Sequence, residues 1–239
     1  MNGFTSVAID ASHLEDYDNF VATRSLAGWL PSELGLEVEV GEIGKKNDQG
    51  LVETEPEEAL TFLDELKSNN IIPDLLAIAN GTSHGNYYNH NQPVAKKINF
   101  NLTLKIINAL KNAKFTTRIA QHGTTGVDLA SLTHLPKCGV LKCNVGTHWM
   151  NLVWKILEKS EPKLFRAIYD WTLSQYQDQL NNMTKQEIFD KYSKFATGEF
   201  KSELDKLDNT TINDIKEKTI FDAKKFIKIL NSSNSAKLL

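Results

Sequence analysis

Three short apolar runs decide the fold of this chain: LLAIA at residues 75–79, RIAQ at 118–121 and GVLKC at 139–143. Each run ends in small and polar residues: NGTSHG at 80–85, HGTTG at 122–126 and NVGT at 144–147. A short apolar run bounded by turn residues predicts a buried parallel strand. Glycines at the ends of such strands allow tight turns and bring backbone N–H groups close to an anion.

The rest of the chain extends this pattern in both directions. Two earlier strands are expected, and in the second an alternating sequence puts Glu37 and Glu39 on one face. The predicted strands lie near residues 6–10, 36–40, 74–79, 117–121 and 139–144. Helical spacing of apolar residues predicts helices over residues 14–27, from 56, over 100–113, after 147, and over 188–195 and 211–230. Residues 42–56 and 86–97 are predicted as long polar loops.

Composition excludes several classes of protein. The 239 residues are 41% hydrophobic, which suffices for a packed core within one barrel domain. A net charge of −3 gives no reason to expect nucleic acid as a partner. The chain has no run of about 18 apolar residues and no signal-peptide pattern, so no membrane association is expected. Cys138 and Cys143 do not make a disulfide framework, which predicts a reducing cytoplasm.

The strand ends resemble motifs of the class II, metal-dependent fructose-bisphosphate aldolase family. The matching segments are 9–13 for I-D-x-S-H, 37–41 for E-x-E-x-G, 81–85 for G-T-x-H-G, 122–126 for H-G-x-S-G and 144–147 for N-V-x-T. Thr125 replaces the family's serine and keeps the hydroxyl group. Each motif alone is weak, but their order along consecutive strands makes the resemblance specific.

The resemblance implies an α/β fold of the (β/α)8 TIM-barrel family. The five predicted strands match the family's fourth to eighth strands, so we expect about the last five β/α units and a helical C-terminal tail. A partial barrel is expected over residues 1–157, with a helical extension over 158–239 packed on it. The family's first three strands have no counterpart, so an N-terminally shortened family member is expected. The family's third strand ends in an Asp-His pair, in which the Asp donates a proton and the His binds zinc. This pair therefore has no counterpart in the chain either.

The resemblance also implies a zinc ion, which would polarise a bound ketone, and leaves a monovalent cation open. His84 and His122 are the candidate ligands, with Glu39 as a third and Asp10 as a neighbour of the site. Simpler roles stay open: the histidines as caps or core residues, Glu39 paired with a lysine inside the barrel, and Asp10 or Ser12 as a helix N-cap.

A phosphate site is predicted from hydrogen-bond donors. Backbone N–H groups at Gly85, Gly123 and Thr125 could form an anion nest, and Thr125 and Thr147 add hydroxyl groups. Asn144 would hold the hydroxyls of a triose. The alternative is that these residues only form turns.

The proton-transfer residue is less defined. In the family a glutamate in the loop that residues 42–48 replace transfers the proton at carbon. Asn47 falls at its place and cannot act as a base, and Asp48, the next residue, could serve instead.

The sequence therefore leads to two hypotheses about function. The first is a class II aldolase-like lyase that reversibly cleaves a ketose phosphate, such as fructose 1,6-bisphosphate, to dihydroxyacetone phosphate and an aldehyde. The second is a non-catalytic remnant that binds a sugar phosphate or metal, or that supports a partner. A small sugar phosphate is the expected ligand, and a homo-oligomer is left open.

Overall fold

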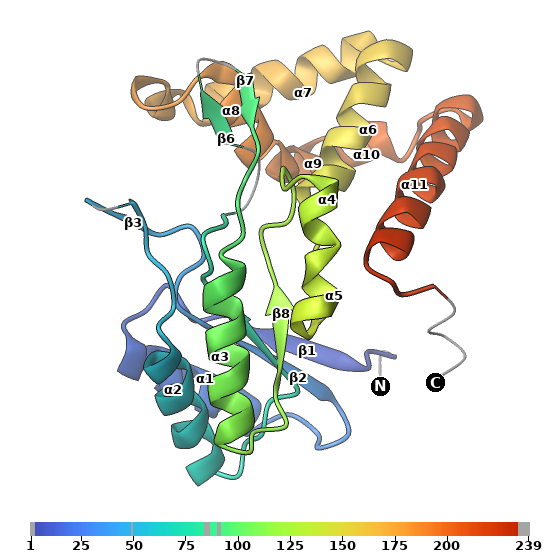
Figure 1. Ribbon diagram of the computed structural model, residues 1–239. Helices are drawn as coiled ribbons and strands as arrows, with labels where there is room; N and C mark the ends of the chain where they lie inside the picture. The colour runs from blue at the N-terminus through green and yellow to red at the C-terminus, as the bar shows by residue number, and fades with distance from the viewer. Residues whose placement is uncertain (1–2, 49, 84–86, 90–91, 234–239) are drawn as a thin grey trace. The chain divides into compact units, whose positions relative to one another are not determined.

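The structure is a computed structural model that describes residues 3–48, 50–83, 87–89 and 92–233 (Figure 1). The chain forms two compact units. The first comprises Met1–Ser83 and Lys97–Asn144, and the second comprises His84–Lys96 and Val145–Leu239. The predicted domain boundary at residue 157 falls inside the second unit, and the expected packing of residues 158–239 on the barrel stays a prediction. No helix in the described part of the chain is long and apolar enough to cross a membrane.

A five-stranded parallel sheet organises the first unit. Its order is β1-β2-β5-β8-β9, with Ile9 opposite Val38 and Val38 opposite Leu76. All five predicted strands are confirmed, with bounds Ser6–Ile9, Gly35–Val40, Leu75–Ile78, Arg118–Gln121 and Val140–Cys143. Since sequential strands are neighbours and all run in one direction, their carboxyl ends and the loops that follow them meet at one edge.

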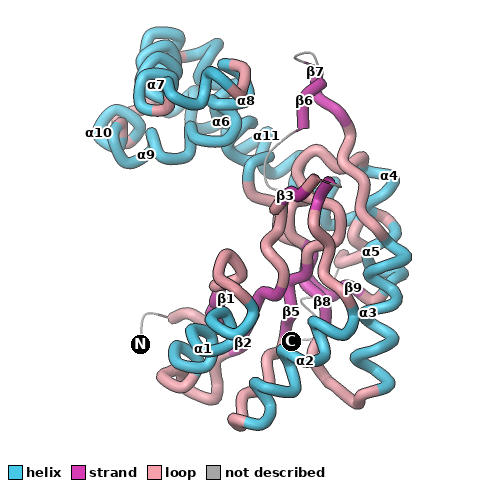
Figure 2. Tube along the Cα trace, turned by 90° about the vertical axis from the view of Figure 1, so that its left-hand side faces the viewer, coloured by secondary structure: helices cyan, strands magenta, loops and turns pink. Residues whose placement is uncertain are grey.

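Three helices join these strands and cover one face of the sheet (Figures 1 and 2). They are α1 (Asp16–Ala27), α2 (Pro56–Ser68) and α3 (Phe100–Asn112). Apolar residues from the helices and from alternate strand positions form one core, which includes Val38, Leu63, Leu76, Ile106 and Ile119, each at most 1% exposed. Because side chains alternate along a strand, the remaining strand positions face the opposite, inner side of the sheet.

The two predicted polar loops contain short strands, which the polar sequence did not indicate. Two antiparallel ladders are present: β3 (Lys46–Asn47) with β4 (Gly50–Leu51), and β6 (Tyr87–Asn89) with β7 (Gln92–Val94). Two short helices, α4 (Leu129–Leu132) and α5 (His134–Cys138), precede β9. Asp128 caps α4 by accepting hydrogen bonds from the backbone N–H groups of Ala130 and Ser131.

The described part of the second unit is mainly helical. Its longer helices are α6 (Thr147–Ser160), α7 (Pro162–Gln175), α8 (Lys185–Tyr192) and α11 (Asn209–Ile229). Shorter turns lie between them: η1 (Gln177–Asn181), η2 (Ser193–Phe195), α9 (Ala196–Glu199) and α10 (Lys201–Leu204). Trp154, Leu157, Ile168 and Phe189 form its buried core. The predicted amphipathic helices after residue 147 are confirmed.

Candidate active site

The inner face of the sheet carries a polar cluster over a floor of small side chains. Glu39, Ala77 and Ala120 lie side by side on β2, β5 and β8, and the two alanines are fully buried. Alanine leaves room above β5 and β8. Longer polar side chains from β2, from β9 and from the loop after β8 therefore meet over this floor.

A β-bulge brings Lys142 into the cluster. The register between β8 and β9 shifts, so that Ile119 lies opposite Val140 but Ala120 lies opposite Lys142. Leu141 is the extra residue and is 70% exposed. Without the bulge, strand alternation would turn Lys142 away from the inner face. Bulges commonly redirect a side chain next to a functional site.

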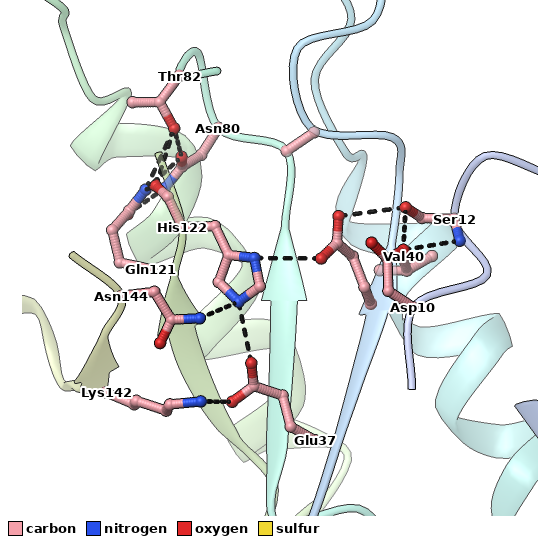
Figure 3. A network of polar contacts seen from close by, with 12 residues as sticks. Asp10, Ser12, Glu37, Val40, Asn80, Thr82, Gln121, His122, Lys142 and Asn144 are labelled. Carbon is pink, nitrogen blue, oxygen red and sulfur yellow. Dashed lines mark hydrogen bonds and ion pairs between the residues drawn. The ribbon is translucent and has the colours of Figure 1, made fainter. Parts of the chain in front are cut away.

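The imidazole ring of His122 lies between two carboxylates (Figure 3). Its Nε2 lies 2.9 Å from Oε1 of Glu37, and its Nδ1 lies 3.2 Å from Oε2 of Glu39. The other oxygen of Glu37 accepts a hydrogen bond from Nζ of Lys142 at 2.7 Å. The expectation that Glu37 and Glu39 share one face is confirmed. The ion pair with a lysine, expected as one option at Glu39, forms at Glu37.

These contacts favour the charged form of His122. Burial lowers its pKa, but hydrogen bonds to Glu37 and Glu39 and their charges outweigh burial and raise the pKa to about 9. Burial likewise raises the pKa of Glu37, and the bonds to His122 and Lys142 lower it below its usual value. The cluster thus pairs the two carboxylates with the His122 ring and the Lys142 side chain.

Asn144 approaches the same ring. Its Nδ2 lies 2.8 Å from Nε2 of His122. A doubly protonated ring cannot accept an amide N–H, so the charged state of His122 calls for the amide turned by 180°, with Oδ1 accepting from Nε2–H. The role of Asn144 toward triose hydroxyls stays a prediction.

Asp10 joins the cluster through Ser12. Oδ1 of Asp10 accepts hydrogen bonds from the backbone N–H and Oγ of Ser12, and Oγ of Ser12 lies 3.1 Å from Oε1 of Glu39. The alternative that Asp10 or Ser12 caps the next helix is wrong, because α1 begins at Asp16 with Glu15 as its N-cap residue. The local turn takes up the Asp10 oxygen instead. A contact between Asp10 and a metal stays a prediction.

A buried amide pair joins the ends of β5 and β8. Nδ2 of Asn80 donates to Oε1 of Gln121 at 2.7 Å, and Nε2 of Gln121 donates to Oδ1 of Asn80 at 3.0 Å. Nε2 of Gln121 and Oγ1 of Thr82 also donate to the backbone carbonyl of His122, at 2.8 and 3.1 Å. The two motif loops are thus bonded to each other through side chains that the sequence did not single out.

The predicted phosphate residues are only partly brought together. Gly123 and Thr125 lie in the loop after β8, where Gly123 adopts a φ of 65° that favours glycine. Thr125 is buried at 9% exposure. Thr147 begins α6 in the second unit, and Gly85 lies outside the described residues. The phosphate site therefore stays a prediction.

Asp48 is exposed in the turn between β3 and β4. The structure neither adds to nor removes its predicted role in proton transfer.

The described geometry does not assemble the predicted zinc site. His122 and Glu39 do lie together, but His84 is outside the described residues. Among the described residues, no group of three or more His, Cys, Asp or Glu side chains could hold a metal ion. Both ring nitrogens of His122 already face carboxylates, so the described donors, as arranged, do not fit a zinc ion.

Comparison with known proteins decides the family. The sequence profile of Fructose-bisphosphate aldolase class-II matches residues 1–234. The chain belongs to the class II fructose-bisphosphate aldolase family. This family is generally zinc-dependent.

Two curated relatives share 29% of the aligned residues with this chain. The chain is 29% identical over 177 residues to a 6-phospho-5-dehydro-2-deoxy-D-gluconate aldolase from Halalkalibacterium halodurans, covering 71% of this chain and 54% of that protein. It is 29% identical over 147 residues to a fructose-bisphosphate aldolase from Mycoplasma pneumoniae, covering 61% and 46%. The chain thus spans about half the length of the curated relatives it matches.

A solved aldolase structure has a similar fold. A fructose-bisphosphate aldolase structure from Campylobacter jejuni superposes with a TM-score of 0.60 at 18% identity, covering 95% of this chain and 61% of that one. The parallel sheet with its helices is therefore the aldolase-like α/β fold of the TIM-barrel family. At this identity the likeness concerns the fold alone.

The sequence did not predict the positions of Asn80, Gln121 and Lys142 beside this cluster. Asn80 and Gln121 end two predicted strands, so polar residues at strand ends were the available signal. Lys142 gave the opposite signal, because period-two alternation from Val140 predicts that it faces the same way as the apolar core. Only the bulge reverses this.

Proposed function

We propose that this chain is an aldolase-type lyase that acts on a phosphorylated ketone. One observation carries the proposal: the partly buried ring of His122, which begins a family motif loop, lies 2.9 Å from Glu37 and 3.2 Å from Glu39, and these carboxylates raise its pKa to about 9. A cation in a partly buried site stabilises a developing negative charge far better than one in water.

Aldol cleavage needs this kind of site. A base removes the proton of a hydroxyl group, the neighbouring carbon–carbon bond breaks, and an aldehyde leaves. The bonding electrons stay on the other fragment as an enediolate, which takes up a proton to give the ketone product. We assign the stabilisation of the enediolate oxygen to His122 and Lys142. Glu37 and Glu39 contact the His122 ring, and we assign the uptake of the hydroxyl proton to one of these two carboxylates.

Zinc binding by His84, His122 and Glu39 is a separate proposal that rests on family membership, because a zinc-bound His122 would have to give up the proton that makes it a cation here. No step above runs through the ion, because the described donors do not converge on one point. A monovalent cation is likewise proposed from the family resemblance alone.

Two substrates follow from the relatives, since both names denote enzymes of phosphorylated ketones. We expect the purified chain to cleave fructose 1,6-bisphosphate or 6-phospho-5-dehydro-2-deoxy-D-gluconate, with product followed in a coupled assay. Replacing His122 with Ala should lower the rate by about 100-fold or more. Absence of cleavage of both compounds, with and without added zinc, would refute the lyase.

Binding without cleavage is the second candidate. The engagement of both His122 nitrogens by carboxylates favours it, because neither nitrogen is available to a metal in this arrangement. In that case calorimetry should detect dihydroxyacetone phosphate binding while the cleavage assay stays flat. Thr125→Val should then weaken binding.

The setting of the protein is also proposed. Both cysteines are free, which agrees with a reducing cytoplasm.

In the described chain β1 and β9 form the two edges of the sheet. Exposed strand edges favour association, so we expect self-association in sedimentation, and a monodisperse monomer would contradict this.

A further inference from the structure

We propose that Asn80 and Gln121 are positioning residues, which set the place of the His122 ring through their buried amide pair. The proposal rests on the proposed function only in taking His122 as the reactive group. It concerns the link between two loops, and not a contact with the substrate.

The amide pair is closed and fully buried. Asn80 and Gln121 are 0% and 1% exposed, and each side chain donates one hydrogen bond to the other. Asn80 also donates to Oγ1 of Thr103 on α3 at 3.1 Å, which anchors the pair to the helix layer. With both carbonyl oxygens and several amide protons bonded, the pair has one favoured arrangement.

The pair reaches His122 through the backbone. Its Gln121 member donates to the carbonyl of His122, and Thr82 donates to the same oxygen from the neighbouring loop. This carbonyl therefore holds two donors from two strand ends. Figure 3 shows these side chains converging beside the ring.

The two loops also touch directly. A Cβ atom added at Gly123 would lie 2.7 Å from the carbonyl oxygen of Ser83 and 2.9 Å from Oγ1 of Thr82. A contact this close leaves little freedom for one loop to shift against the other. The hydrogen bonds and the close contact at Gly123 thus hold the same two loops together, the one after β5 and the one after β8.

Stability alone does not account for a polar pair here. Buried amides gain only a modest net free energy from their hydrogen bonds, and apolar side chains of similar volume often serve the core as well. The core positions Ile78 and Ile119, nearby on the same strands, are apolar. What apolar side chains cannot supply is a directional bond to the His122 carbonyl.

A consequence follows for the ring. Glu37 and Glu39 are fixed in β2, whereas His122 follows the end of β8. If the His122 carbonyl is released, the ring moves relative to both carboxylates. Its N–H groups then lose the short contacts that keep them from exchanging with water.

The experiment compares two variants in the full chain. Gln121→Met removes the pair and the bond to the His122 carbonyl, while keeping an unbranched side chain. Thr103→Val is the matched control, because it removes the hydrogen bond from Asn80 on the helix side and the bond from Thr103 to the Asn99 carbonyl, but no bond to Gln121, Thr82 or the His122 carbonyl. The readout is the pair of imidazole N–H signals of His122 in nitrogen-edited NMR, together with the unfolding midpoint.

We expect both variants to lose stability but only Gln121→Met to change the ring. Its N–H exchange should quicken at least about tenfold, which corresponds to about 1.4 kcal/mol of lost protection. In Thr103→Val the signals should match those of the wild type. Equal ring signals in wild type and Gln121→Met, or equal changes in both variants, would overturn the proposal.

A milder pair of variants covers the case in which Gln121→Met does not fold. Thr82→Val removes one of the two bonds to the His122 carbonyl, and Thr82→Ser keeps it. Faster exchange in the first with recovery in the second supports positioning, and identical behaviour overturns it. These signals do not depend on turnover. A chain without aldolase activity would refute the proposed function and leave this result readable.

Discussion

The pH dependence of stability should reveal the charge on His122. The perturbation is His122→Gln, which removes the ionisable ring and keeps a polar side chain. The pKa of His122 rises from 6.5 to about 9 on folding. At 1.36 kcal/mol per pKa unit, this difference corresponds to about 3 kcal/mol. The side chain is only 14% exposed, so solvent screening removes little of it.

The sign of the effect follows from proton binding. Between pH 6.5 and about 9 the folded chain keeps the proton on His122 and the unfolded chain loses it. Stability gained from His122 is therefore fully present below about pH 6.5, and it is lost as the pH rises through about 9. The pKa of Glu37 is lowered, so this carboxylate stays ionised throughout the window.

The assay is urea unfolding of wild type and His122→Gln across this window. The difference between their unfolding free energies should fall by about 3 kcal/mol from about pH 6 to about pH 10. Lys96, whose pKa burial lowers to about 8, titrates in the same range. It is present in both proteins, so its contribution cancels in the difference. A difference that does not change with pH would refute the charged, carboxylate-bound ring.

Three further predictions concern the same region. Lys142→Met should cost about 1 kcal/mol or less in urea unfolding, because Lys142 is 44% exposed and its ion pair with Glu37 is screened; a loss of several kcal/mol would contradict this. Gly123→Ala should lower the unfolding free energy by about 1–3 kcal/mol, since its φ is 65° and the added methyl group meets the neighbouring loop; an unchanged thermal midpoint would show that the loop adapts. If zinc binds through the motif histidines, His84→Ala should reduce the zinc retained after dialysis, and equal retention would remove His84 from the ligands.

Local sequence was sufficient for much of the sheet. Apolar runs such as residues 75–79, each followed by turn residues, matched all five parallel strands, because strand formation at these positions depends on nearest neighbours and burial. The alternation of Glu37 and Glu39 with Val38 likewise predicted that both carboxylates share a face. The helix start was less well predicted, because Asp10 and Ser12 bond to each other before α1 begins.

The sequence by itself therefore determined the family, the five strands and the side of the sheet on which Glu37 and Glu39 lie, because these follow from short-range pattern. The tertiary structure decided which groups surround His122. Glu37 and Lys142 are 105 positions apart and meet only because a bulge at Leu141 turns the lysine inward. Asn80 and Gln121 are 41 positions apart, and their pairing depends on the register of β5 against β8. Such contacts depend on strand register and sheet curvature, which the packing of the whole sheet sets.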